Sequence, residues 1–457
     1  MDELRVLSPT AILGYGFPSA SLAAGMDRQP HVIAVDAGST DAGPYFLGMR
    51  AGEDTGKLGE FAKAMEADLR PLLRAATSAR IPLIIGSAGG AGGNFHLLGL
   101  TFLIQRIAKE DALRFPMAAI QAEIDPEIVK KKLRQGKVAP LGPVPELTER
   151  DVDRAVRIVA QMGVEPYLRA LELGFSVIVA GRSSDVSMFA ALPIREGFDH
   201  GLSLHLGKIL ECGAIAAEPG SGSDVVLGTI RRDHFLVEPM NPARRCTIRS
   251  VAAHSLYESA DPWRIHEPGG VVDLSAVSFT QEDERTVRIS GSRFVRDPVY
   301  RIKLEGAELV GYRTICIAGI RDPSVIHHLN EILLAVRKAA AAQFVDLNHD
   351  SYQLQFRVYG RDGVMGLYEP NPVPCHEVGL LIEVVSPTQE QATSICLFVR
   401  AFILHYGFPG RTSTAGNLAF PISPQEIPVG AVHRFSIYHL MEVEDGLEQF
   451  PIQVIEV

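Results

Sequence analysis

The chain has 457 residues, 46% of them hydrophobic and 21% charged, and its formal net charge is −10. Its length exceeds the size at which single cores stop growing, which favours two domains, and its negative charge argues against binding to nucleic acid or to an anionic membrane surface. The five cysteines form no CxxC pair, which argues against a disulfide scaffold or a structural zinc site and indicates a cytoplasmic protein.

Short apolar runs alternate with helical patterns through the first half of the chain. The runs begin at residues 11, 31, 82, 117 and 176, and the helical patterns between them cover 57–78, 95–113 and 151–173. Apolar strands that alternate with helices predict an α/β domain, in which a parallel sheet carries helices on both faces. We expect this domain to cover residues 1–270 and to bind its ligand beyond the carboxyl ends of the strands.

The first polar loop, 36–44, follows the apolar run that begins at residue 31. It contains Asp36, Ser39 and Asp41. Carboxylates in such a loop are suited to binding a divalent cation or to acting as acid and base, whereas capping of a turn or helix is the alternative for either aspartate. We predict that Asp36 and Asp41 are catalytic and that Ser39 binds the substrate.

A glycine-rich loop follows the apolar run 82–85, and a helical pattern begins after it at Asn94. Converging backbone N–H groups and a helix N-terminus favour an anion, although such glycines also allow tight packing of strand against helix. The spacing matches neither the dinucleotide fingerprint nor a P-loop, so no nucleotide cofactor is predicted. The glycines also split the uncharged stretch 81–105, which argues against a membrane span. The residues predicted to bind the substrate here are Ser87, Gly89, Gly90, Gly92, Gly93 and Asn94.

Two further polar segments come at the ends of later apolar runs. Glu123 shares one strand face with Gln121, where it serves either as a catalytic carboxylate or as part of a solvated strand end. The segment 181–185 contains Arg182, Ser183 and Asp185. We predict that Arg182 and Ser183 bind a substrate anion and that Asp185 is catalytic, with helix capping as the alternative for Asp185.

The second half of the chain has a different pattern. Strands follow one another from residue 271, and the order strand, helix, strand, strand, helix, strand then leads to the C-terminus. This order predicts a smaller α+β ferredoxin-like domain over residues 271–457. A long Gly-rich loop at 405–420 contains Arg411. We predict that Arg411 binds substrate, with the loop closing over the first domain's site, and the alternative is that the loop joins a subunit interface. Cys212, beside Glu211, is expected to be buried filler and not a nucleophile.

Several of these motifs together resemble the family of acyclic terpene utilisation proteins called AtuA. The matching segments include VDAGSTDAGPYFLG (35–48), IIGSAGGAGGNFHL (84–97), AGRSSDVSMFAALP (180–193), GKILECGAI (207–215), HSLYESADP (254–262) and HYGFPGRTSTAGNLAFP (405–421). The resemblance implies a catabolic enzyme, branched acyl-CoA thioesters among the family's intermediates, and a small companion subunit. Many members carry an acidic residue in the first loop, but residues 14–21 of this chain contain none, so that carboxylate's role is not transferred.

The carboxylates, hydroxyls and arginine, without a Ser/His/Asp or Cys/His arrangement, favour proton transfer next to a carbonyl. We therefore expect a cytoplasmic lyase that acts on a small carboxylic acid or an acyl-CoA thioester. Two alternatives stay open: a hydrolase that uses a metal-bound water, and a non-catalytic or partner-dependent large subunit of a two-component enzyme. A divalent metal is compatible with the carboxylates, and exposed strands favour a homo-oligomer.

Overall fold

The computed structural model describes residues 1–38, 43–50, 55–345, 347, 351–371, 373–411 and 415–457. Contacts divide the chain into two units: unit 1 comprises Met1–Glu308 with Phe435–Val457, and unit 2 comprises Leu309–Arg434. The sequence placed a boundary at 270/271 instead. The difference arises because strand β15 (Val287–Ser290), beyond residue 270, pairs with β10 (His234–Pro239) in the sheet of unit 1.

A large mixed sheet forms the centre of unit 1. Its strand order is β14-β15-β10-β9-β1-β2-β3-β7-β4-β21. The central strands are parallel: β1 (Glu3–Ser8), β2 (Val32–Gly38), β3 (Leu83–Gly90), β7 (Val177–Ala180) and β4 (Met117–Ile120). The flanking strands are antiparallel: β9 (Val226–Arg231), β10, β15 and β14 (Ser278–Gln281) on one side, and β21 (Ile452–Ile455) on the other.

The predicted parallel sheet is therefore present as the core of a mixed sheet. The short turn between β9 and β10 makes this edge antiparallel, because consecutive strands with a tight connection can only form a hairpin. One predicted strand, at 11–17, is not present, and β1 takes its place earlier in the chain, with Leu4, Val6 and Leu7 buried.

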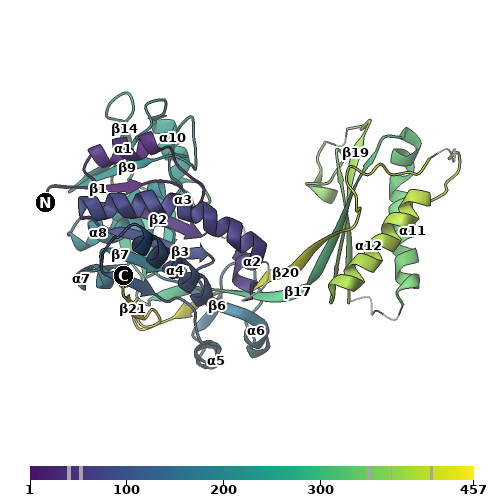
Figure 1. Ribbon diagram of the computed structural model, residues 1–457, viewed down its shortest axis with the longest axis horizontal. Coiled ribbons are helices and arrows are strands. Elements are labelled where there is room, and N and C mark those ends of the chain that lie inside the picture. The colour runs from purple at the N-terminus through teal and green to yellow at the C-terminus, as the bar shows by residue number, and fades with distance from the viewer. Residues whose placement is uncertain (39–42, 51–54, 346, 348–350, 372, 412–414) are drawn as a thin grey trace. The chain divides into compact units, whose positions relative to one another are not determined.

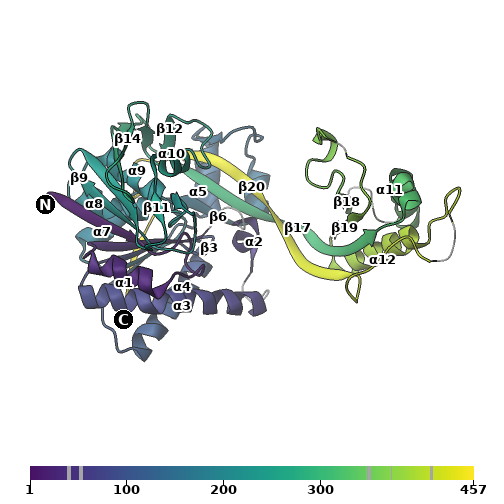
Figure 2. The ribbon, with the colours of Figure 1, turned by 90° about the horizontal axis from the view of Figure 1, so that it is seen from above.

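Helices cover both faces of this sheet, as predicted (Figures 1 and 2). The first face is covered by α7 (Glu165–Glu172), α8 (Ser187–Arg195) and α9 (His200–Leu210), and the other by α1 (Ser19–Asp27), α3 (Thr55–Ala79) and α4 (Asn94–Glu110). Successive side chains of a strand point to opposite faces, so β2 contributes Val32 and Ala34 to the first core and Ile33 and Val35 to the second. This explains why the central strands read as continuous apolar runs.

Smaller elements complete unit 1. They are α2 (Gly43–Gly48), α5 (Pro126–Arg134), β5 (Val138–Pro140), α6 (Glu149–Arg154), β6 (Ala155–Gln161), β8 (Ala217–Glu218), β11 (Arg245–Cys246), α10 (Ile248–Ser255), β12 (Arg264–Glu267), β13 (Gly270–Asp273) and β16 (Arg293–Arg296). The first part of the long strand β17 (Arg301–Ile320) also belongs here, where it pairs antiparallel with β6 from Lys303 to Glu308.

Unit 2 has the predicted order of elements. The second part of β17 is followed by α11 (Pro323–Gln343), β18 (Gln353–Tyr359), the short helix η1 (Gly366–Tyr368), β19 (Val378–Ser386), α12 (Gln389–His405) and the first part of β20 (Ile427–Glu442). The strands lie in the order β18-β19-β17-β20, and α11 and α12 share one apolar core with β17, β18 and β19. The assignment of this unit as ferredoxin-like stays a prediction. Of the helices in the described ranges, none is long and apolar enough to cross a membrane.

Candidate active site

Asp36 lies at the carboxyl end of β2, in the middle of the parallel strands. Its side chain is held by the fold, because β2 is buried along its whole length and Asp36 itself is only 4% exposed. One carboxylate oxygen accepts the backbone N–H of Ala37 at 2.8 Å. Burial, reinforced by the negative charge of Asp185, raises the pKa of the Asp36 carboxyl well above its usual range. Asp36 is therefore suited to carrying a proton at neutral pH.

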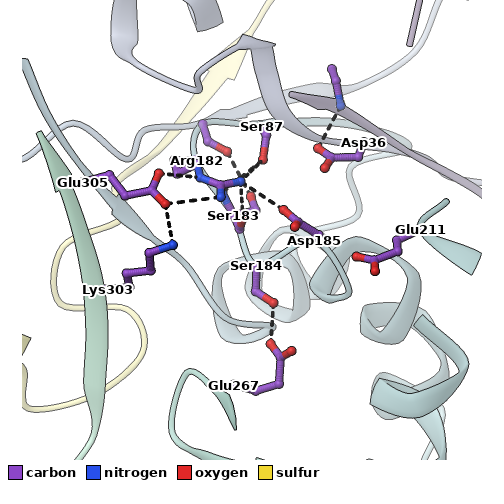
Figure 3. A network of polar contacts seen from close by, with 12 residues as sticks. Asp36, Ser87, Arg182, Ser183, Ser184, Asp185, Glu211, Glu267, Lys303 and Glu305 are labelled. Carbon is purple, nitrogen blue, oxygen red and sulfur yellow. Dashed lines mark hydrogen bonds and ion pairs between the residues drawn. The ribbon is translucent and has the colours of Figure 1, made fainter. Parts of the chain in front are cut away.

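The segment that follows β7 places Arg182 and Asp185 beside the ends of β2 and β3. Arg182 is 3% exposed, and its Nη1 donates to the Asp185 carboxylate at 3.0 Å and to Ser87 Oγ at 3.1 Å. Ser87 is the non-glycine residue of β3 that adopts a left-handed φ, at +44°. Figure 3 shows the guanidinium at the centre of the network.

Arg182 is also paired with a buried carboxylate from β17. Its Nε donates to Glu305 Oε2 at 2.8 Å, and Lys303 Nζ lies 2.7 Å from the other oxygen of Glu305. Burial alone would raise the pKa of the Glu305 carboxyl, but Arg182 and Lys303 outweigh it and hold that pKa at about 2. The charge of Arg182 is thus balanced within the protein. The predicted binding of a substrate anion by Arg182 stays a prediction, and it would require Arg182 to exchange some of these partners.

The low pKa of Glu305 predicts a specific loss of stability in acid. An unfolded glutamate titrates near 4.5, so the Glu305 contribution is fully present above that pH and is lost as pH falls toward about 2. This contribution is about 3 kcal/mol when the shift is converted to free energy. Denaturant unfolding of the wild type and of Glu305→Gln should show a stability difference that shrinks as pH falls through this window. A difference that is unchanged between about pH 6 and about pH 3 would contradict this explanation.

Ser183 and Ser184 connect the same segment to the helices and to β12. The Ser183 hydroxyl lies 2.6 Å from the hydroxyl of Tyr167, which is fully buried in α7, and it donates to the carbonyl of Gly181 at 2.9 Å. The Ser184 hydroxyl donates to the carboxyl group of Glu267. Burial raises the pKa of Glu267 to about 8. These serines are therefore bound within the protein and fix the path of the chain after β7.

A cavity of about 150 Å³ opens next to Asp36 and Asp185. Glu211, at the end of α9, faces the same space, and Figure 3 shows Asp185 between Arg182 and Glu211. Lys208 Nζ lies 2.5 Å from Glu211 Oε1, yet burial raises the pKa of the Glu211 carboxyl to about 7. The other lining residues are Ala11, Ile12, Tyr15, Gly38, Cys212, Ile215, Tyr257 and Glu258. The cavity thus gathers carboxyl groups in different surroundings, which is what acid–base chemistry needs.

Cys212 also lines this cavity. Burial and the neighbouring Glu211 raise the pKa of its thiol above the usual value. A thiol in this state is a poor nucleophile. Cys212 is half-buried and lines the cavity, so the expectation that it is buried filler is wrong.

The glycine-rich segment packs tightly against the protein itself. It forms the end of β3 and the turn into α4, and Gly89, Gly90 and Gly92 have φ values of +65°, +96° and +66°. A Cβ added at Gly92 would lie 2.1 Å from the backbone nitrogen of Arg182, and one at Gly93 would lie 2.4 Å from Cδ of Arg157. Tight packing of the strand end against its neighbours, the alternative given above, therefore explains these glycines. Substrate binding by them stays a prediction.

Glu123 occupies the helix N-terminus at which a substrate anion was expected. Its Oε2 accepts the backbone N–H of Asn94, the first residue of α4, at 2.9 Å, and lies 3.2 Å from Arg157 Nε. A carboxylate at this position is stabilised by the free N–H groups and the helix dipole. The structure thus brings Glu123 and Asn94 together as a cap, and a catalytic role for Glu123 stays a prediction.

The remaining predicted residues lie elsewhere. Ser39 and Asp41 fall outside the described residues. Arg411 belongs to unit 2, where its Nε donates to Asn417 Oδ1 at 2.9 Å and its Nη2 to the carbonyl of Ala415 at 3.0 Å. Substrate binding by Arg411 stays a prediction.

Sequence reasoning did not assign a role to Glu267 or Glu305. A signal for Glu305 was present, because Lys303 and Glu305 put opposite charges on one face of a strand whose neighbours Ile302 and Leu304 are apolar. Such a pattern indicates a charged partner on the element that covers that face. For Glu267 the local sequence carries no comparable signal.

Unit 1 is thus an α/β unit with a carboxyl-lined cavity at the carboxyl ends of its parallel strands, the position at which open sheets of this class bind ligands. A family model described as acyclic terpene utilisation family protein AtuA matches residues 23–222 and 234–429. These segments cover most of the chain. The chain therefore belongs to this family, and membership suggests involvement in acyclic terpene utilisation. No curated protein and no solved structure matches the chain.

Proposed function

We propose that the protein is a catabolic lyase that transfers protons next to the carbonyl group of a small carboxylic acid or acyl-CoA thioester, with Asp36 and Asp185 as the acid–base pair. One observation carries the proposal: both carboxyl groups face the same cavity. Burial and the charge of Asp185 keep a proton on Asp36, whereas Asp185 is held in an ion pair by Arg182. Two carboxyl groups in such different environments are suited to opposite roles.

In the dehydration direction, the Asp185 carboxylate removes the proton from the carbon next to the carbonyl. The carbon–oxygen bond to the β-hydroxyl breaks, and Asp36 donates its proton to the departing oxygen, which leaves as water. The products are the enoyl compound, protonated Asp185 and ionised Asp36, and exchange with solvent restores both groups. Hydration is the reverse.

The size of the cavity supports a small reacting group. A cavity of about 150 Å³ is known to hold a molecule the size of benzene. A short branched acyl or hydroxyacyl chain is of this size, and a larger thioester carrier would lie outside. Arg182 acts in this proposal as a positioning residue, because it orients the Asp185 carboxylate.

The test is proton exchange and water elimination in deuterated water, followed by nuclear magnetic resonance on short branched acyl-CoA, enoyl-CoA and 3-hydroxyacyl-CoA probes. We expect the wild type to place deuterium on the α-carbon and to interconvert the enoyl and hydroxyacyl forms. Asp185→Asn should lose both activities by about 10²–10⁴-fold, because the base is gone. Asp36→Asn should lose the interconversion by a similar factor and keep more of the exchange, because only the acid is removed.

The matched control is Asp153→Asn. Asp153 is an exposed aspartate in α6 whose partner is Lys130, and its replacement should leave both activities at the wild-type level. Wild-type rates in Asp185→Asn would contradict the assignment of the base. No turnover of any probe would contradict the lyase, and restoration by a companion subunit would favour the partner-dependent alternative.

Hydrolysis by a metal-bound water is the second candidate. It is favoured by Glu211, Cys212 and His254, whose possible ligand atoms lie within 4.8 Å of one another. Hydrolysis of the same thioesters would release the free acid and coenzyme A without deuterium on the α-carbon. The spectra therefore distinguish the two reactions.

We also propose that unit 2 is a ferredoxin-like domain. The support is its element order and its strand order β18-β19-β17-β20, with α11 and α12 sharing one core.

A further inference from the structure

Two elements of unit 1 bring a carboxylate, a thiol and an imidazole together. Glu211 and Cys212 come at the end of α9, and His254 lies in α10, which packs on α9. One possible ligand atom from each residue lies within 4.8 Å of the others. Carboxylate oxygen, thiolate sulfur and imidazole nitrogen all serve as zinc ligands. The fold, and not a sequence motif, creates this group.

His254 supplies an independent observation. It is 4% exposed, and its Nε2 has no hydrogen-bond partner within the described part of the chain. A buried ring nitrogen without a partner is costly, and native proteins satisfy nearly all such groups. The ring is also held in place, because it stacks on Tyr257 with 5.5 Å between the ring centroids. The ring is thus held in place, and none of the described residues satisfies its Nε2.

We propose that Glu211, Cys212 and His254 form a binding site for a divalent metal ion of the zinc type. The presence of sulfur and imidazole nitrogen favours zinc or a similar borderline-soft ion over calcium or magnesium, which prefer all-oxygen ligands. Cys212 releases its proton to solvent when its sulfur binds the ion. Lys208 is the competing cation. It bonds Oε1 of Glu211, so the ion either binds the other oxygen of this carboxylate or displaces Lys208.

The position of the group suggests its role. Glu211 and Cys212 line the cavity that Asp36 and Asp185 share, and zinc held by three protein ligands keeps a position open for water or substrate. The ion would polarise a substrate oxygen as a Lewis acid. This role rests on the proposed function, whereas the metal site itself does not.

The test is metal binding by the full chain after treatment with a chelator. We expect about one equivalent of zinc to bind in a titration followed by elemental analysis. Cobalt in place of zinc should give the near-ultraviolet charge-transfer band of a thiolate–cobalt bond. Cys212→Ser should lose this band, and Cys212→Ser and His254→Gln should each weaken binding by more than the roughly 10–100-fold that loss of an outer-shell partner costs.

Two matched controls separate this site from adventitious binding. Cys375 is a half-exposed cysteine of unit 2, and His327 is an exposed histidine of the same unit. Cys375→Ser and His327→Gln should leave the affinity and the cobalt band unchanged. Circular dichroism reports whether each variant is folded.

A wild type without the thiolate band, or folded site variants that bind metal as the wild type does, would overturn the metal site. The wild-type spectrum decides this even if a variant fails to fold. None of these readouts depends on turnover, so failure of the metal site and failure of the proposed lyase are separately visible.

Discussion

Replacing Gly92 with alanine is expected to destabilise unit 1 by several kcal/mol, on the order of the summed costs of overpacking and of a strained backbone. The added Cβ would lie 2.1 Å from the backbone nitrogen and 2.5 Å from Cα of Arg182. These are main-chain atoms, so no side-chain rotation relieves the clash. The φ of +66° adds strain for any residue with a Cβ.

The clash lies where the site is assembled. The backbone of Gly92 accepts the N–H of Arg182 at 3.0 Å, so a shift at Gly92 displaces the guanidinium that holds Asp185 and Glu305. We therefore expect Gly92→Ala to lose the proposed lyase activity as well as stability. Equilibrium unfolding in denaturant measures the first effect, and the exchange assay the second.

Gly99 supplies the matched control for this substitution. It lies in the middle of α4, where a Cβ meets nothing within 4 Å. Gly99→Ala should stabilise the protein by about 0.5–1 kcal/mol, because alanine loses less backbone entropy in a helix. If both alanine variants unfolded at the same denaturant concentration, the proposed packing of the glycine segment would be wrong.

Replacing Arg182 with methionine is the second change with a large expected effect. It leaves Glu305 buried with Lys303 alone and removes the partner of Asp185. Breaking a buried ion pair by removing one member costs about 3–5 kcal/mol. Denaturant unfolding at neutral pH should show this loss, together with loss of the proposed activity.

Two comparisons make the Arg182 prediction sharper. Arg74→Met removes an exposed arginine from Asp111, which keeps Arg70 as a second partner, and it should change stability little, because ion pairs of exposed side chains contribute little. The double variant Arg182→Met, Glu305→Leu should recover part of the lost stability, because it no longer leaves a buried carboxylate with an incomplete set of partners. A double variant that is less stable than Arg182→Met would contradict this explanation.

The sequence predicted those parts of the fold whose pattern lies within one short segment of the chain. The apolar runs at 31–35, 82–85, 117–120 and 176–180 predicted parallel strands that are present. The helices α11 and α12 also take the two helix positions of the predicted order strand, helix, strand, strand, helix, strand. Strands β14 and β15 fall in the predicted succession of strands after residue 271, but the sequence did not assign them to the large sheet, and β9, β10 and β21 were not predicted. The pairing of these strands with the rest of the sheet joins segments that are distant in the chain, such as β9 with β1, β10 with β15 and β21 with β4.

Among the polar residues, the sequence likewise predicted individual positions but not their partners. Asp36, Arg182 and Asp185 were singled out by their positions after apolar strands, and the structure gathers them because the carboxyl ends of neighbouring parallel strands meet at one edge. The partners of these residues were not visible. Glu305 reaches Arg182 from β17, and Glu123 reaches the first residue of α4, so both fill positions that the sequence alone left to a ligand.

The sequence by itself determined the parallel core of unit 1, the element order of unit 2 and the family, because periodicity and motifs are properties of short segments. Only the tertiary structure decided which charges are already neutralised and which polar atoms are left without a partner. His254 meets Glu211 and Cys212 only after α10 has packed on α9. Such pairings depend on the distances between elements, and a linear pattern does not contain those distances.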